Sequence, residues 1–358
     1  MQGETAAKAE DRPELGAERG AGQGADRPSG GAGRLVAVVV TCNRLDKLRD
    51  TVARLLDSPE AELYRLVVVD NASTDGTPGW LAALDDPRVE PVLNDANLGG
   101  AGGFDAGMRA AVARHDPDWL VLMDDDGRPA PGGLAAFHAM DLDGIEGVAA
   151  AVYFPDGRIC EMNRPSRNPF WYPRAFLRTV LRLGGRGGFH ISPQVYDAGE
   201  TVPIDVTSFV GFFVSRKGVS RAGYPDPGLF LYGDDGLYTL GLSAAGGRIV
   251  FAPQVRFEHD CSTFSSAQRG RFSPLWKVYY YHRNLVLLYR MAAGPVLFWP
   301  LMAVIVPKWL WKARVHDGAR RAFLGLMLRA IRDGLRRRTE VPHARVQGWA
   351  AGVRPPAE

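Results

Sequence analysis

Alternation between short apolar runs and helical patterns constrains the fold of this chain more than any other feature of its sequence. Residues 34–40 form an almost wholly apolar, β-branched run, and apolar residues at helical spacing follow over 46–56. The pattern returns at 66–69, after which Thr77-Pro78 opens a second helix with proline at its favoured first position. Strands that alternate with helices pair in parallel, so we expect an α/β fold with a mostly parallel central sheet flanked by helices.

Further strands extend this pattern along the chain. We expect strands at 89–93 and 119–123, separated by a glycine-rich turn and a helix at about 104–114. Beyond a less regular region, strands at 203–215 and 248–257 are expected to return the chain to the same sheet.

Composition limits the class of protein. At 358 residues and 46% hydrophobic content, the chain can bury one large core or two smaller ones. Its three cysteines are far apart and odd in number, so neither a disulfide framework nor a cysteine-rich zinc module is expected. Residues 1–33 carry almost no large apolar side chains, and we expect a disordered tail without a signal peptide. These features favour the cytoplasm.

The last quarter of the chain is strongly basic, with thirteen Lys and Arg against two acidic residues over 277–338. Within it, 285–310 is apolar but interrupted by Arg290 and several prolines, which favours an interfacial or re-entrant segment over a clean membrane span. The segment 320–338 then sets apolar residues on one helical face and arginines around them, and an anionic membrane surface is the expected partner. The apolar positions are Leu324, Leu328, Ile331 and Leu335. A basic helix docked on the domain itself is the alternative.

Three consecutive carboxylates, Asp124, Asp125 and Asp126, follow the apolar run at 119–123. Ligands of open α/β sheets collect beyond the carboxyl ends of strands, and carboxylates there can hold a hard divalent cation that binds phosphate oxygens. The alternative is an acidic turn with a structural role.

Four motifs stand in a fixed order along the first part of the chain. They are VVVTCNR at 38–44, VVVDNASTDGT at 67–77, NLGGAGGF at 97–104 and MDDD at 123–126. Together they resemble the family 2 glycosyltransferases, and most closely the rhamnosyltransferase and galactofuranosyltransferase branch. The resemblance covers about 34–265 and implies the nucleotide-diphospho-sugar transferase fold called GT-A. A helical membrane-associating region at 266–340 and a flexible tail at 341–358 are expected to follow.

The resemblance implies that the first three motifs bind the donor. Thr41, Arg44 and Asp70 are expected to line the nucleotide, with the Arg44 guanidinium able to bind a diphosphate through two hydrogen bonds. A turn-forming role for Asp70 and a surface role for Arg44 are the alternatives.

Glycines of the third motif are expected to permit close backbone approach to the donor diphosphate. Asn97, Gly99 and Gly100 are the residues assigned to donor binding there. A dinucleotide fingerprint is excluded, because its last position is occupied by Asp105. The remaining alternative is a flexible turn.

The resemblance also implies a metal site and a catalytic base. Asp124 and Asp126 are expected to bind Mn²⁺ or Mg²⁺ with His259 as a further ligand, while Asp125 points away or touches the sugar. The acidic pair Asp234-Asp235 is expected to supply the base, with Asp235 favoured over Asp234 and a structural role as the alternative.

We therefore expect an inverting, metal-dependent glycosyltransferase in bacterial cell-surface polysaccharide synthesis. Its donor would be a nucleoside-diphosphate-sugar of the UDP or dTDP type carrying galactofuranose or rhamnose, and its acceptor a glycan or a polyprenyl-linked glycan. Nucleic acid is not expected as a partner, and self-association into a homo-oligomer is left open. We expect the protein to be cytoplasmic and peripheral on the inner face of the cell membrane. A catalytically inert nucleotide-sugar-binding scaffold and a nucleotidyltransferase are the alternatives.

Overall fold

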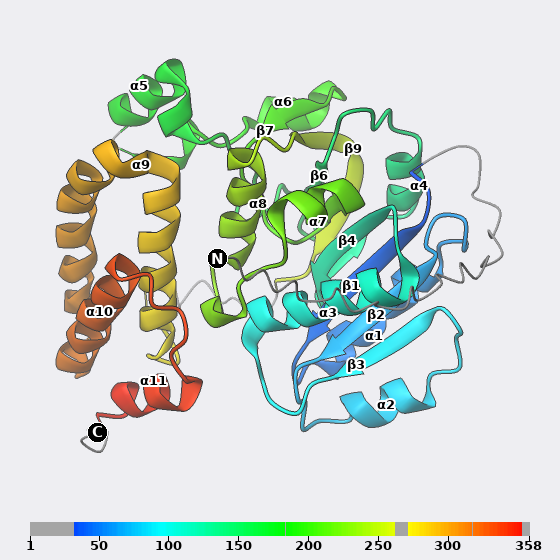
Figure 1. The fold of residues 1–358 in the computed structure, drawn as a ribbon, viewed down its shortest axis with the longest axis horizontal. Helices are drawn as coiled ribbons and strands as arrows, with labels where there is room; N and C mark the ends of the chain where they lie inside the picture. The colour runs from blue at the N-terminus through cyan, green and yellow to red at the C-terminus, as the bar shows by residue number, and fades with distance from the viewer. Residues whose placement is uncertain (1–31, 183, 262–270, 317, 353–358) are drawn as a thin grey trace, which may run out of the picture.

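A mixed sheet is the centre of the structure, which is a computed structural model describing residues 32–182, 184–261, 271–316 and 318–352 (Figure 1). In that part of the chain the strand order is β3-β2-β1-β4-β8-β6-β9-β5, with β7 paired to β9. The strands are β1 (Leu35–Thr41), β2 (Arg65–Asp70), β3 (Val89–Leu93), β4 (Trp119–Asp124), β5 (Gly127–Pro129), β6 (Gly147–Tyr153), β7 (Val202–Ile204), β8 (Phe212–Ser215) and β9 (Ile249–His259). The first four in this order are parallel, as the alternating sequence pattern predicts.

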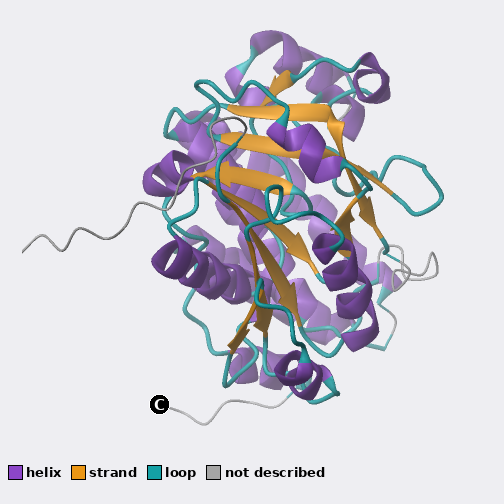
Figure 2. Ribbon diagram, turned by 90° about the vertical axis from the view of Figure 1, so that its right-hand side faces the viewer, coloured by secondary structure: helices purple, strands orange, loops and turns teal. Residues whose placement is uncertain are grey.

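Helices cover both faces of this sheet (Figure 2). The helices are α1 (Leu45–Leu56), α2 (Thr77–Ala83), α3 (Gly99–His115), α4 (Gly133–His138), α5 (Pro173–Leu181), α6 (Pro193–Ala198), α7 (Arg216–Ala222), α8 (Asp234–Ala244), α9 (Lys277–Trp311), α10 (Arg320–Leu335) and α11 (His343–Ala350). Buried side chains of α1, α2 and α4 form one core with the sheet, and those of α3, α6, α7 and α8 form a second core on the other face. A third core joins α9, α10 and α11.

Two predicted elements differ in the structure. The single strand expected at 203–215 is two strands, β7 and β8, because Gly211 turns the backbone at φ +69° between them. The strand β6, with sequence GVAAAVY, is absent from the sequence-based prediction. Alanine and glycine are depleted in strands, so this run lacks the β-branched signal even though it is buried between β8 and β9.

The glycine run at 99–103 is not a turn, because it forms the first turns of α3. Its glycines let the helix lie close against the sheet. A Cβ on Gly103 would fall 2.5 Å from Val40 Cγ1, and one on Gly107 would fall 2.4 Å from Val38 Cγ1. The prediction that α3 begins at about residue 104 is therefore wrong by about one and a half turns of helix.

The C-terminal helices agree with expectation in one place and depart from it in another. The apolar segment in α9 breaks at Gly294, where φ is +65°, and its second half turns back beside the first (Figure 1). The tail expected to be flexible contains α11, which packs through the buried Val346. Residues 353–358 of that expected tail, like 1–31 of the N-terminal one, lie outside the described residues.

Helix α10 does not present the predicted apolar face to a membrane. Its buried apolar residues are Phe323, Leu326, Met327 and Ala330, which pack in one cluster with α9. Of the predicted face, Leu328 is exposed and the other three are partly buried in the same cluster. The alternative, a basic helix docked on the protein, therefore describes α10 better.

Candidate active site

Strand ends bring three predicted site residues to one edge of the sheet. Parallel pairing places Thr41 of β1 opposite Asp70 of β2, and Val40 of β1 opposite Asp124 of β4. The carboxyl ends of parallel strands meet at one edge, so the loops that follow these strands form a common surface.

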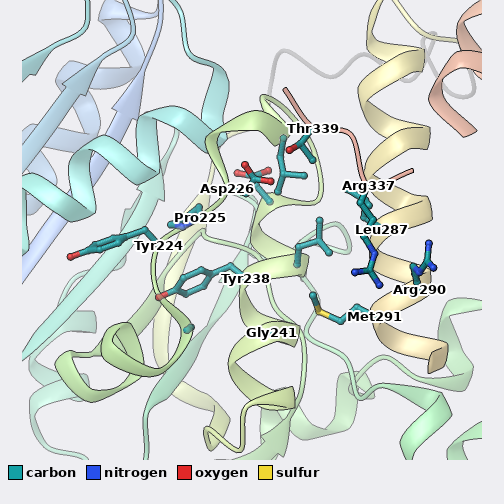
Figure 3. A pocket seen from close by; sticks show the side chains of 14 residues that line it. Tyr224, Pro225, Asp226, Tyr238, Gly241, Leu287, Arg290, Met291, Arg337 and Thr339 are labelled. Carbon is teal, nitrogen blue, oxygen red and sulfur yellow. The ribbon is translucent and has the colours of Figure 1, made fainter. Parts of the chain in front are cut away.

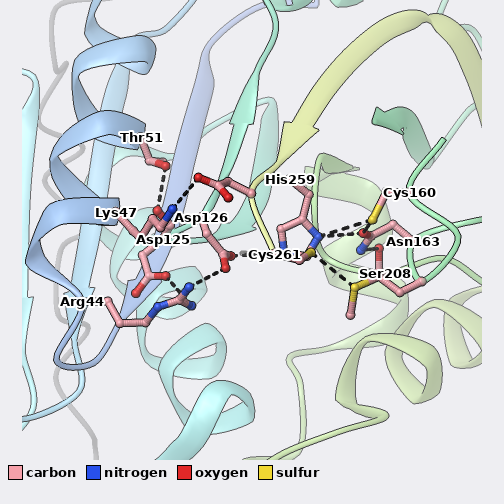
Figure 4. Close-up of polar contacts among 12 residues, drawn as sticks. Arg44, Lys47, Thr51, Asp125, Asp126, Cys160, Asn163, Ser208, His259 and Cys261 are labelled. Atoms are coloured by element: carbon pink, nitrogen blue, oxygen red, sulfur yellow. Dashed lines mark hydrogen bonds and ion pairs between the residues drawn. The ribbon is translucent and has the colours of Figure 1, made fainter. Parts of the chain in front are cut away.

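The middle carboxylate, Asp125, points back into the protein. It is only 2% exposed and accepts a 2.8 Å hydrogen bond from Thr41 Oγ1, while its backbone carbonyl accepts one from Thr51 (Figure 4). Thr41 is equally buried. These contacts fix the carboxylate turn against β1 and α1, which leaves Asp125 and Thr41 as supports behind the site.

Arg44 bridges two of the three carboxylates. Its Nη1 lies 2.9 Å from Asp125 Oδ1, and its Nη2 lies 2.6 Å from Asp126 Oδ2. The guanidinium is about one third exposed, so it faces the surface as well as the carboxylates. A partly exposed guanidinium beside this cluster can also bind an anionic group that approaches from solvent.

His259 reaches the same cluster from β9. Strand β5 pairs antiparallel with β9, which puts Gly127 opposite His259. His259 Nε2 then lies 3.2 Å from Asp126 Oδ1. Lys47 of α1 forms an ion pair with the following residue, Asp260, and so ties the end of β9 to the other side of the site.

Electrostatics distinguish the outer carboxylates. Burial, followed by the charges of Asp126, Asp125 and, more weakly, Asp235, raises the pKa of Asp124 to about 7. Burial would also raise the pKa of Asp126, but hydrogen bonds and charge from His259 and Arg44 outweigh it and lower that pKa. In the described part of the chain no cationic side chain forms an ion pair with Asp124. Asp124, Asp126 and His259 offer oxygen and nitrogen donors of the kind that a divalent cation binds, and the charge of such a cation would compensate Asp124.

The loops after β1 and β2 are tied together by short polar side chains. Asn43 Oδ1 accepts hydrogen bonds from the backbone N–H groups of Thr74 and Asp75, at 2.7 and 3.3 Å. Asp70, which is buried, accepts one from the Ser73 N–H at 3.1 Å. Asp70 therefore makes the turn-forming hydrogen bond that was the alternative to nucleotide binding. It also lies at the end of β2, at the edge of the site.

The third motif reaches this edge through α3. Asn97 Oδ1 accepts a hydrogen bond from Gly99 N, and Asn71 Nδ2 donates to Gly99 O, both at 2.8 Å. A Cβ on Gly99 would lie 2.0 Å from the Phe230 carbonyl oxygen, and one on Gly100 would lie 3.9 Å from Asp234 Oδ2. The glycines therefore bring the start of α3 against the loop before Asp234. Asn71, which joins two motifs, was not singled out from sequence.

Asp234 and Asp235 form the first turn of α8. Burial and then the charge of Asp235 raise the pKa of Asp234 well above its ordinary value. Burial raises the pKa of Asp235 to about 6. Because the charge of Asp235 contributes to the raised pKa of Asp124, the acidic pair lies within electrostatic range of the Asp124–Asp126 cluster.

Asp234 also lines a pocket of about 570 Å³ between α8, α9 and the segment after α10. Figure 3 shows Arg290 and Arg337 on one side of it and Tyr224 and Tyr238 on the other. Leu237, Leu287 and Met291 contribute apolar lining. The pocket therefore combines cationic and apolar groups next to the acidic pair.

The loop before the acidic pair is held by α9. Arg283 is fully buried and donates hydrogen bonds to the carbonyl oxygens of Gly228 and Leu229, both at 2.8 Å. Asn284 donates to Leu231 and Tyr232. Neither residue could be assigned a role from sequence, since their partners are backbone groups more than fifty positions away.

Comparison with known proteins agrees with this geometry. Residues 36–194 match the family described as Glycosyl transferase family 2. Galactofuranosyltransferase GlfT1 of Mycolicibacterium smegmatis is 28% identical over 234 residues, which are 63% of this chain and 71% of the relative. Undecaprenyl-phosphate mannosyltransferase of Micrococcus luteus is 31% identical over 157 residues, which are 42% of this chain and 61% of the relative. The matched region spans 24% of the length of succinoglycan biosynthesis protein ExoO of Rhizobium meliloti, and 71% and 61% of the lengths of two GlfT1 galactofuranosyltransferases.

Solved structures show the same fold. The S. aureus TarS fragment 1–349 in complex with UDP-GlcNAc superposes with a TM-score of 0.52 at 11% identity, covering 89% of this chain and 92% of that one. GalNAc-T7 with UDP, GalNAc and Mn²⁺ superposes with a TM-score of 0.50 at 15% identity, covering 71% of this chain and 47% of that one.

Proposed function

We propose that this chain, in which residues 36–194 match glycosyl transferase family 2 and which has the GT-A fold, is an inverting, metal-dependent glycosyltransferase of cell-surface polysaccharide synthesis. The donor would be a nucleoside-diphosphate-sugar of the UDP or dTDP type, with galactofuranose or rhamnose as the sugar. The observation that carries the proposal is that the strand ends with Asp70 and Asp124 meet at one sheet edge, where the start of α3 lies against the loop before Asp234. The galactofuranosyltransferase relative supports the choice of sugar.

On the donor side, Asp124, Asp126 and His259 would hold Mn²⁺ or Mg²⁺. When bound, such a cation neutralises negative charge that develops on a departing diphosphate. Arg44, which lies beside the same carboxylates, would bind the diphosphate oxygens. Asp70 and the backbone around Gly99 and Gly100 would contact the nucleotide and sugar.

On the acceptor side, Asp235 would act as the general base. Its carboxylate takes the proton of the acceptor hydroxyl as that oxygen attacks the anomeric carbon of the donor. The bond between the anomeric carbon and the diphosphate oxygen breaks, and the nucleoside diphosphate leaves from the opposite face, so the configuration inverts. Asp234, the neighbour of this base in the chain, lines the pocket that also contains Arg290 and Arg337.

That pocket suits an acceptor carried on a lipid diphosphate. Arg290 and Arg337 would bind phosphate oxygens, while Leu237, Leu287 and Met291 would contact the start of an apolar chain. The undecaprenyl-phosphate mannosyltransferase relative supports a polyprenyl acceptor.

A membrane surface would be reached through α5 and the second half of α9. These elements share the lining of an apolar groove of about 640 Å³. Around it, Leu181 is 75% exposed and Val296 is 79% exposed. Acidic residues are absent from 163–182 and 271–316, whereas both stretches carry several Lys and Arg. An apolar surface with basic flanks is typical of proteins that lie on an anionic bilayer.

Crossing of the bilayer is a separate question. Among the described residues, one helical stretch, Lys277–Val315, is long and apolar enough for it by length and composition alone. The break at Gly294 divides α9 into two limbs, 277–293 and 295–311, each at the short end of the roughly 17–25 residues that a span requires. We therefore propose a peripheral position on the cytoplasmic face.

A donor screen tests the function. Purified protein with Mn²⁺ and a panel of nucleotide sugars should release nucleoside diphosphate in the presence of a polyprenyl-linked acceptor. Asp235→Asn should abolish transfer while retaining donor binding. Donor binding by the unaltered protein without turnover would instead identify an inert scaffold, and release of pyrophosphate would identify a nucleotidyltransferase.

A further inference from the structure

Three soft ligand atoms from distant parts of the chain meet behind the carboxylate cluster. Cys160 Sγ, Cys261 Sγ and His259 Nδ1 all lie within 4.8 Å of one another. Cys160 and His259 are buried, and Cys261 is partly buried. Figure 4 shows the Cys160 sulfur on the side of the His259 ring that faces away from Asp126.

An amide oxygen completes the group. Asn163 Oδ1 lies 2.7 Å from His259 Nδ1 and 2.9 Å from Cys160 Sγ. The Asn163 amide nitrogen donates to Ser208 Oγ at 2.8 Å, and this bond turns the oxygen toward the cysteine and the histidine.

Strand pairing brings these residues together. Strands β6 and β9 are parallel neighbours, and Tyr153 near the end of one pairs with Glu258 near the end of the other. The chain turns back after β6 so that the Cys160 N–H donates to the carbonyl of Val152. Cys160 therefore lies at the same end of the sheet as His259 and Cys261.

We propose that Cys160, Cys261, His259 Nδ1 and Asn163 Oδ1 form a binding site for a thiophilic divalent cation such as Zn²⁺. Tetrahedral zinc binds sulfur at about 2.3 Å and nitrogen at about 2.0 Å, which separates neighbouring ligand atoms by about 3.3–3.8 Å. Cys160 Sγ and His259 Nδ1 are 3.9 Å apart. The two cysteine sulfurs, which are at most 4.8 Å apart, would need to approach by at most about 1 Å, and Asn163 Oδ1, at 2.7 Å from His259 Nδ1, would need to move away by roughly 0.5 Å.

Occupation of this site has a consequence that rests on the proposed function. A neutral imidazole carries one ring proton, so a cation on His259 Nδ1 leaves that proton on Nε2, where it is donated to Asp126 Oδ1 at 3.2 Å. His259 then cannot give Nε2 to a cation held by Asp124 and Asp126. The soft-metal site and the donor-metal site therefore compete for one histidine.

Binding of Cd²⁺ alone to the full, reduced, metal-free chain tests the site without donor or turnover. We expect one Cd²⁺ bound with the ultraviolet charge-transfer absorption of cadmium–thiolate bonds. Cys160→Ser and Cys261→Ser should each weaken Cd²⁺ binding by roughly 10- to 100-fold or more. Loss of a residue that only supports a metal ligand already weakens metal affinity by about that factor. Cys42→Ser is the matched control, since Cys42 is also a free cysteine but lies outside the cluster, and it should bind as the unaltered protein does.

Two further measurements keep the outcome decisive. Circular dichroism should show that Cys261→Ser, which alters a partly buried residue, retains the fold, and Asp126→Asn should keep the thiolate absorption. The proposal is overturned if the unaltered protein shows no such absorption, if the absorption disappears with Cys42, or if the folded Cys261→Ser variant binds Cd²⁺ unchanged. Because none of these readouts involves sugar transfer, failure of the proposed enzymatic function would leave them unaffected.

Discussion

The Asn284 side-chain amide donates a 2.7 Å hydrogen bond to the carbonyl oxygen of Tyr232, two residues before Asp234. Tyr232 and Phe230 have positive φ values of 69° and 63°, which non-glycine residues rarely adopt. The loop that presents the acidic pair is therefore held in a strained shape by the first half of α9. The loop before Asp234 therefore depends on α9, although the two belong to regions that the sequence separates into a glycosyltransferase domain and a C-terminal extension.

Asn284→Ala should lower kcat more than it raises KM for the donor, because the loop that positions Asp235 loses its support. Three carbonyl oxygens lose a donor, and each buried one left unpaired costs about 1–3 kcal/mol of folding stability. Steady-state kinetics and thermal unfolding measure the two effects. Gln347→Ala, which removes an exposed amide on α11, is the control and should change neither. Unchanged kcat in a destabilised Asn284→Ala variant would show that α9 supports the fold alone.

Activity should decline below about pH 6. Burial raises the pKa of Asp235 to about 6, so its carboxylate takes up a proton at a higher pH than an exposed aspartate and can no longer act as a base. The rate should therefore fall about tenfold per unit of pH below that value, whereas an ordinary aspartate near 3.9 would sustain activity to about pH 4. The measurement is kcat/KM against pH at two Mn²⁺ concentrations. A decline caused by Asp124 would move with Mn²⁺, and one caused by Asp235 would remain in place.

Asp126→Asn should raise the Mn²⁺ concentration needed for half-maximal rate, on the order of 10-fold or more, because the variant loses a charged ligand. It also removes one partner of Arg44 and of His259. Asp85→Asn, which neutralises an exposed carboxylate after α2, is the matched control for net charge. Equal Mn²⁺ dependence of the two variants would exclude Asp126 as a ligand.

The sequence identifies those parts of the site that depend on strand ends. Thr41, Asp70 and Asp124 could be placed at one edge because the alternation of strands and helices implies parallel pairing, and the structure has that pairing. The glycine run at 99–103 lies at the expected edge of the sheet, but it is the start of a helix and not the expected turn. Its close fit to Val38 and Val40 depends on helix-to-sheet packing, which leaves no pattern along the chain.

Contacts between distant segments explain what the sequence does not reveal. Arg283 bonds to carbonyl groups, which every residue carries, so no residue pattern marks its partners. The two cysteines that meet at His259 are about one hundred positions apart, and only the pairing of β6 with β9 brings them together. Membrane contact was expected of both 285–310 and α10. The periodicity of α10 is clear, but α9 already covers its apolar side.

Vesicle binding can separate the two candidate membrane surfaces. If α5 and the second half of α9 lie on the bilayer, the double variant Leu181→Asp, Val296→Asp should weaken binding to anionic vesicles, since each change places a carboxylate in an apolar, basic surface. Leu328→Asp on α10 is the matched control, because Leu328 is 58% exposed but lies on the helix whose apolar side is covered by α9. Sedimentation with vesicles that contain anionic lipid, compared with neutral vesicles, measures the difference. Stronger loss with Leu328→Asp than with the double variant would return the membrane contact to α10, and equal binding by all three proteins would remove both surfaces from consideration.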